Sequence, residues 1–111
     1  MSNYNLIYAT AASRDEALAL GRALVEARLA ACANVLPGMS SVYWWEGRVE
    51  QADETVLLLK TRAELVEAAM ARLRELHSYA CPCVIVLPIM AGNPDFLAWI
   101  ADETQGAAPA P

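Results

Sequence analysis

The feature that most constrains the fold of this chain is a long β-hairpin between residues 34 and 60. Its two arms are rich in β-forming residues and meet at Glu46-Gly47, a typical turn sequence. Each arm holds about 12 residues and would extend about 40 Å, whereas an ordinary strand has about 5–6 residues. Pro37-Gly38 interrupts the first arm and indicates a bulge or a bend.

The apolar patterns on either side of the hairpin complete the order of elements. Residues 13–16 and 61–64 are capping boxes, and each is followed by apolar residues at helical spacing. Asn93-Pro94-Asp95 places a cap, a proline and an acid where a terminal helix would begin. The predicted elements are a strand over residues 5–10, a helix of about 18 residues after Ser13, hairpin strands over 33–45 and 49–60, a helix ending near Leu76, a strand over 83–88 and a helix ending near Glu103.

This order predicts an α+β fold of the ferredoxin-like β-α-β-β-α-β type, with a long hairpin between its second and third strands and an added C-terminal helix. The 111 residues are enough for one domain, which we expect to span residues 1–105. Residues 106–111 contain only Gly, Ala and Pro, and we expect them to form a flexible tail.

The hairpin also predicts an oligomer. The first helix covers only about 27 Å, so roughly a third of the hairpin must extend beyond its own helices. Tyr43, Trp44 and Trp45 lie on that overhang, and alternation along a strand sends the two indoles to opposite faces. Exposed aromatic side chains of this kind are typical of an interface, so we predict homo-oligomerisation through the hairpin. The alternative is a hairpin that curls over its own core.

Charge and composition exclude several classes of partner. The net charge of −5 and the absence of a basic run argue against binding to nucleic acid or to an anionic membrane. No signal-peptide pattern begins the chain, and its longest apolar stretch is too short to span a bilayer. We therefore expect a soluble cytoplasmic protein. The hydrophobic fraction of 57% is high for so small a domain, which again favours an oligomer.

The most unusual chemistry lies between residues 77 and 83. In an extended chain, Cys81 and Cys83 would point to the same side, and imidazole and thiolate suit zinc and copper. Cys32 would join His77 and this pair if the second strand lay close by. The alternative is that both thiols act as small buried hydrophobes while His77 ends a helix.

Nothing in the sequence favours catalysis. His77 is the sole histidine, so any serine- or cysteine-based triad would have to include it. The nucleotide-binding loops, the G-x-S-x-G motif and the C-x-x-C motif are all absent from the sequence. We expect a protein that is not an enzyme.

Several segments together resemble a known family. They are residues 29–34 (Leu-Ala-Ala-Cys-Ala-Asn), Pro37-Gly38, 41–47 (Ser-Val-Tyr-Trp-Trp-Glu-Gly), 58–61 (Leu-Leu-Lys-Thr), 75–77 (Glu-Leu-His), 87–89 (Leu-Pro-Ile), 92–94 (Gly-Asn-Pro) and 97–100 (Leu-Ala-Trp-Ile). In this order, over about residues 5–103, they resemble the divalent-cation tolerance (CutA) family. The resemblance implies a ferredoxin-like subunit, a tight homotrimer, a cytoplasmic location and a role in tolerance of copper and other divalent ions.

The resemblance also directs attention to Cys32 and His77 as metal ligands. The family pattern after the histidine has a proline and later a glutamate, where this chain has Ser78 and Cys83. A thiolate in place of a carboxylate predicts a shift towards soft ions such as Cu(I), Zn or Hg. The candidate ligands are thus Cys32, His77, Cys81 and Cys83, with copper as the first candidate ion and zinc as the alternative, and no ion is expected to be required for folding.

A second hypothesis treats the chain as a trimeric signalling protein that binds a small molecule or a partner protein, similar to nitrogen-regulatory proteins. Its ligand would lie in a cleft between subunits lined by Lys60 and Tyr79. Metal binding would then be incidental.

Overall fold

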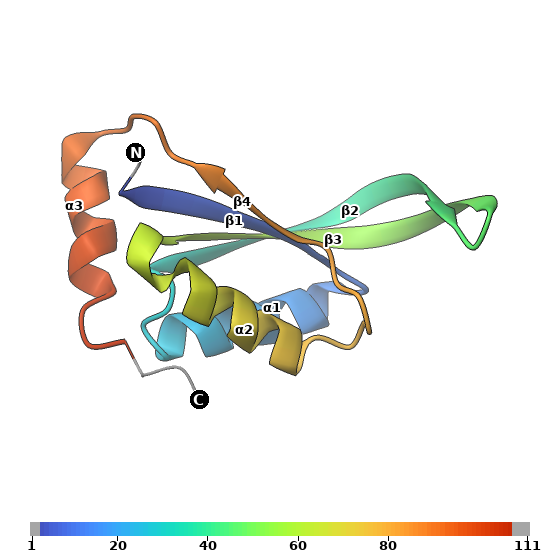
Figure 1. Ribbon diagram of the computed structural model, residues 1–111, viewed down its shortest axis with the longest axis horizontal. Coiled ribbons are helices and arrows are strands. Elements are labelled where there is room, and N and C mark those ends of the chain that lie inside the picture. Colours follow the sequence, from blue (N-terminus) through green and yellow to red (C-terminus); the bar gives the residue numbers. More distant parts are fainter. Residues whose placement is uncertain (1–2, 108–111) are drawn as a thin grey trace.

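The computed structural model describes residues 3–107, which form one four-stranded antiparallel sheet, three α-helices and a short 3₁₀ helix (Figure 1). No helix within residues 3–107 is both long and apolar enough to cross a membrane. The elements are β1 (Tyr4–Ala11), α1 (Arg14–Glu26), β2 (Cys32–Trp45), β3 (Arg48–Arg62), η1 (Ala63–Leu65), α2 (Val66–Leu76), β4 (Val84–Pro88) and α3 (Pro94–Glu103).

The strand order is β2-β3-β1-β4, and every neighbouring pair is antiparallel. Both α1 and α2 lie on one face of this sheet, whereas α3 stands at the end away from the hairpin tip (Figure 1). The α+β architecture predicted from the sequence, including the long β2-β3 hairpin and the terminal helix, is confirmed.

The hydrophobic core lies between the sheet and the pair α1 and α2. Ile7 of β1 and Leu57 and Leu59 of β3 point to this side and are fully buried. They pack with Leu24 of α1 and Leu73 of α2, which are also fully buried. The alternation of β1 and β3 therefore assigns every second residue to this core and leaves the intervening residues on the opposite face.

That opposite face is largely uncovered. The C-terminal end of α3 is fixed to it by Arg62, whose Nε donates to Thr104 Oγ1 at 2.8 Å and whose guanidinium pairs with Glu64 at 2.6 Å. Beyond α3 the face is apolar, and Leu36, Ile85 and Leu87 are about half exposed. A sheet face of this composition is typical of a surface that another chain covers.

The hairpin extends well past the rest of the sheet. The pairing of β1 with β3 stops at Ala11 and Thr55, so residues 48–54 of β3 pair with β2 as their only neighbouring strand. The overhang, predicted as a third of the hairpin, is nearly half of β3. The predicted irregularity at Pro37-Gly38 is confirmed, because the register of β2 against β3 shifts between Leu36 and Met39.

Two boundaries differ from the sequence prediction. Helix α1 is shorter than expected and ends at Glu26, because Arg28 adopts a positive φ of 62° and the Leu29 N–H bonds back to the Leu24 carbonyl. The predicted capping box at residues 61–64 does not form. Thr61 instead continues β3 opposite Asn5 of β1, and its hydroxyl is buried without a hydrogen-bond partner among the described residues.

The C-terminal part of the chain was predicted to contain a capped helix and a tail. The N-cap at Asn93 is confirmed, because its side chain accepts a hydrogen bond from the Asp95 N–H at 3.2 Å. Of the expected tail, Ala107 packs partly buried against the core. The remaining part, residues 108–111, lies outside the described residues.

Candidate functional site

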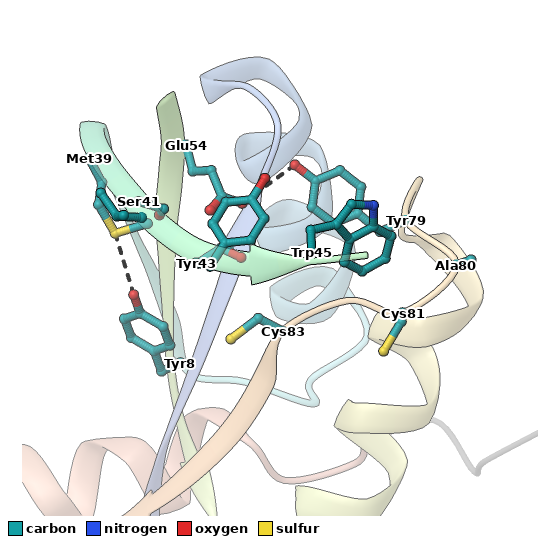
Figure 2. Close-up of a pocket in the computed structure, with 12 residues that line it drawn as sticks. Tyr8, Met39, Ser41, Tyr43, Trp45, Glu54, Tyr79, Ala80, Cys81 and Cys83 are labelled. Atoms are coloured by element: carbon teal, nitrogen blue, oxygen red, sulfur yellow. Dashed lines mark hydrogen bonds between the residues drawn. The ribbon is translucent and has the colours of Figure 1, made fainter. Parts of the chain in front are cut away.

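A pocket of about 740 Å³ opens on the uncovered face of the sheet, at the base of the overhanging hairpin (Figure 2). Its walls come from three strands and from the loop that precedes β4. The lining residues are Tyr8, Thr10, Met39, Ser41, Val42, Tyr43, Trp45, Glu54, Tyr79, Ala80, Cys81 and Cys83.

The bulge at Pro37-Gly38 decides which aromatic side chains reach the pocket. Before it, even-numbered residues of β2 share a face with Val56, whereas after it Met39 pairs with Glu54. The extra residue reverses the alternation, so Tyr43 and Trp45 line the pocket with Glu54. Gly38 supplies the positive φ of 83° that this turn of the chain requires.

Trp44 lies outside this pocket. Its side chain is 74% exposed, whereas Trp45 lines the pocket wall. The predicted separation of the two indoles is thus observed, and both of them remain more than half exposed in the isolated chain.

Glu54 is the one formally charged side chain among the lining residues. The Tyr79 hydroxyl donates to its Oε2 at 3.5 Å, and Figure 2 shows its carboxylate beside the ring of Tyr43. Burial raises the pKa of Tyr79, and the negative charges of Glu54 and Glu16 raise it further. The only formal charge among the lining residues is therefore negative.

His77 anchors the loop that carries the two pocket cysteines. Its side chain is fully buried, with Nε2 donating to the Thr10 carbonyl at 2.7 Å. Its Nδ1 accepts the Tyr79 backbone N–H at 3.0 Å. Because both ring nitrogens already have partners, His77 has no lone pair free to coordinate an ion in this conformation.

Glu16 of α1 holds the same loop from the other side. Its carboxylate accepts the Ser78 N–H at 3.0 Å and the Ala12 N–H at 3.2 Å. Burial opposes ionisation, but these hydrogen bonds outweigh it and lower the pKa of Glu16 below its usual value. The capping box predicted at residues 13–16 is confirmed in part: Ser13 Oγ accepts the Glu16 N–H at 3.1 Å, but Glu16 reaches Ala12 rather than the cap residue.

The four predicted metal ligands are not brought together within one chain. Cys81 and Cys83 are exposed free thiols that both line the pocket. Figure 2 shows the Cys83 sulfur directed towards Tyr8 and the Cys81 sulfur at a separate place further along the same loop. The expectation of a common side required an extended chain, but strand β4 begins only at Val84. Within residues 3–107, no group of three or more His, Cys, Asp or Glu side chains is arranged to hold a metal ion.

Cys32 and Lys60 lie at the other end of the sheet. They face each other across β2 and β3, and Lys60 Nζ donates to Asn34 Oδ1 at 2.9 Å. The ammonium also lies 5.5 Å from the centre of the Phe96 ring of α3. Of the two residues predicted to line a cleft between subunits, Tyr79 lines the pocket of this chain and Lys60 does not.

Sequence reasoning missed three of the polar or polarisable lining residues. Glu54, Met39 and Tyr8 belong to three different strands, and Tyr8 donates its hydroxyl hydrogen to Met39 Sδ at 3.4 Å. Their proximity depends on strand order and on the register after the bulge. The only indication of these residues in the sequence was the position of Glu54 on the overhanging arm of the hairpin.

Comparison with known proteins gives a consistent result. Residues 5–103 match the family described as CutA1 divalent ion tolerance protein. A divalent-cation tolerance protein CutA from Archaeoglobus fulgidus is 43% identical over 101 residues, which cover 91% of this chain and 97% of that protein. Among solved structures, CutA from Xylella fastidiosa superposes with a TM-score of 0.91 at 41% identity, covering 94% of this chain and 100% of that one. The structure described as the periplasmic divalent cation tolerance protein CutA from Archaeoglobus fulgidus has a TM-score of 0.89 at 39% identity, covering 92% and 99%.

Proposed function

The chain belongs to the CutA1 divalent ion tolerance protein family, and on that premise we propose that it works as a non-enzymatic homotrimer that binds copper. The family is associated with divalent-cation tolerance. The observation that carries the proposal is the pair of free, exposed thiols, Cys81 and Cys83, in one pocket of an otherwise incomplete sheet face.

The uncovered sheet face supports the oligomer. Its half-exposed Leu36, Ile85 and Leu87 adjoin a hairpin whose Trp44 is 74% exposed. Burying this apolar area against identical copies would add to the stability of the 111-residue chain. Tyr43, Trp44 and Trp45 are the proposed interface residues.

The thiols support copper over harder ions. Cysteine thiolates are soft ligands that favour Cu(I), and zinc is the alternative ion. We assign Cys81 and Cys83 as the first ligands, with a rotation of the Cys81 side chain to bring its sulfur towards Cys83. The loop between His77 and Val84 contains no regular structure that would oppose this rotation.

His77 and Cys32 take other roles in this proposal. His77 positions the loop through its two hydrogen bonds and is not itself a ligand. Cys32, beside Lys60 at the far end of the sheet, forms no part of the same site in one chain.

The test is a competition titration of Cu(I) against a chromophoric chelator under anaerobic, reducing conditions. Wild-type protein is expected to bind one ion per chain. Cys81→Ser and Cys83→Ser should each weaken binding by at least about tenfold, because a single thiolate replaces a pair.

Cys32→Ser is the matched control, since it removes a thiol outside the pocket, and its affinity should equal that of the wild type. Unchanged affinity in both pocket variants would exclude Cys81 and Cys83 as ligands. Loss of binding in Cys32→Ser alone would move the site to the other end of the sheet.

We further propose that the protein is cytoplasmic. Its three cysteines are unpaired, which suits a reducing compartment. The relative from Archaeoglobus fulgidus is described as periplasmic, so fractionation of cells producing the tagged protein is the appropriate test. Recovery with the periplasmic markers would refute the proposal.

A further inference from the structure

The tip of the β2-β3 hairpin carries a positive charge without a partner. Arg48 is the only basic residue between positions 29 and 59. It is exposed and forms no ion pair with any of residues 3–107. It lies opposite Trp45 in the pairing of β2 with β3, so both side chains belong to the face of the hairpin on which the pocket opens.

The base of the hairpin carries a negative charge that is only weakly compensated. Glu54 is partly buried, and its hydrogen bond from the Tyr79 hydroxyl is long, at 3.5 Å. No Lys, Arg or His side chain lines the pocket around it. A carboxylate that an interface covers needs a cation beside it, because removing an unpaired charge from water is strongly unfavourable.

The two charges cannot meet within one chain. Arg48 and Glu54 lie six residues apart on the continuous strand β3. At about 3.3 Å per residue, their Cα atoms are roughly 20 Å apart. Figure 1 shows the tip of the hairpin extending away from the rest of the sheet. A contact between the two side chains must therefore join two copies of the chain.

We propose that the hairpin tip of a second copy covers the pocket of each chain and places its Arg48 against Glu54. This inference rests on the proposed homotrimer and names the contact that builds it. The tip also brings apolar surface on the same face as Arg48, because Trp45 is 57% exposed in the isolated chain. The receiving pocket has an apolar wall that includes Tyr8 and Met39.

The symmetry of this contact suits a ring. The tip and the base of the hairpin are different surfaces, so each copy donates one tip and receives another. A heterologous contact of this kind, repeated by the same rotation, closes into a ring in which every Arg48 and every Glu54 is paired. No thiol takes part, so the contact is separate from the proposed copper ligands.

The first test is subunit exchange between tagged and untagged protein, followed by native mass spectrometry. Arg48→Glu and Glu54→Arg each bring like charges together, so exchange should be at least about tenfold faster than in the wild type. The double variant Arg48→Glu/Glu54→Arg restores opposite charges and should exchange within about threefold of the wild type.

Arg22→Glu is the matched control. Arg22 is also exposed and forms no ion pair within residues 3–107, but it lies on α1. Its variant should exchange within about twofold of the wild-type rate. Unchanged exchange in both single variants, or no recovery in the double variant, would overturn the inference and leave the trimer in place. A wild type that forms no oligomer would refute the proposed trimer as well.

The second test is chemical cross-linking, which decides the question even if the charge-reversed chains fail to fold. Arg48→Cys and Glu54→Cys are combined in a chain whose three natural cysteines are replaced by serine, and a short bismaleimide is added. Covalent products of up to three chains are expected on a denaturing gel. Arg48→Cys/Asp53→Cys is the matched control and should give none, because Asp53 points to the opposite face of β3.

Two outcomes of the cross-linking would overturn the inference. The absence of products between chains would assign the pocket to another occupant. Products of two chains at most would exclude the ring.

Discussion

At the scale of single residues, the loop before β4 depends on two polar side chains, the buried His77 and the partly exposed Glu16. His77 hydrogen-bonds to β1 through Thr10 and to its own loop through Tyr79. Glu16 hydrogen-bonds to the same loop through Ser78 from the start of α1. The sequence identified His77 as chemically unusual, but it could not distinguish a ligand from an anchor, because that depends on where Thr10 lies.

The first residue-scale prediction concerns Glu16→Gln. The pKa of Glu16 is lowered in the folded protein, so its ionised form contributes stability that is fully present above its unfolded value, about 4.5, and is lost as the pH falls through the lower folded value. At pH 7 the free energy of unfolding of the variant should be about 1 kcal/mol lower than that of the wild type. Urea denaturation at several pH values should show this difference shrinking below about pH 4.5. A difference that grows on acidification would contradict the assignment.

The second residue-scale prediction concerns Thr61→Val. The Thr61 hydroxyl is fully buried and lacks a hydrogen-bond partner among residues 3–107, so an isosteric apolar side chain removes a desolvation cost. The variant should gain about 1 kcal/mol in free energy of unfolding. Thr104→Val is the opposite control. The Thr104 hydroxyl donates to the Ile100 carbonyl at 2.8 Å, so its removal should lower the free energy of unfolding. A loss of stability in Thr61→Val would mean that the hydroxyl has a partner.

At the scale of elements, the sequence predicted the order of strands and helices but not all of their boundaries. Periodicity and caps located the hairpin, the bulge and the terminal helix, since these are local signals. Helix α1 ends early through the left-handed conformation of Arg28, a residue type that gives no such signal. Thr61 resembled a helix cap but remains in β3, because pairing with Asn5 of β1 outweighs local capping.

The bulge also limits how much of the site could be predicted. Pro37-Gly38 indicated an irregularity, but whether it adds one residue or two was not encoded locally. That number decides whether Tyr43 and Trp45 or their neighbours face Glu54. Cys81 and Cys83 were identified because only one residue separates them in the sequence, whereas the place of Glu54 in the pocket depends on the tertiary register.

The element-scale prediction concerns Gly38→Ala. Gly38 has a φ of 83°, and a Cβ there would meet nothing within 4 Å, so the cost is confined to the backbone. The variant should lose about 1 kcal/mol of stability. Gly38→Asn should lose less, because asparagine tolerates this conformation better than alanine. Equal losses, measured by thermal unfolding, would show that the positive φ is not what the position requires.

At the scale of the whole molecule, helices pack against only one face of the sheet over most of its length. Helices α1 and α2 cover one face of the sheet, and the hairpin extends beyond both of them (Figure 1). The sequence predicted an exposed aromatic hairpin from the length of its arms and from the alternation of Trp44 and Trp45 along the strand. The uncovered face emerges only from the strand order, which brings Leu36, Ile85 and Leu87 onto one side. Three copies packed through these surfaces would bury them and complete the walls around each pocket.

We propose that identical copies cover this face, and sedimentation equilibrium at low micromolar concentration measures whether they do. We expect a mass of about 36 kDa, three times the 12.0 kDa of one chain, with no dissociation on dilution across that range. A stable species at 12.0 kDa would contradict it.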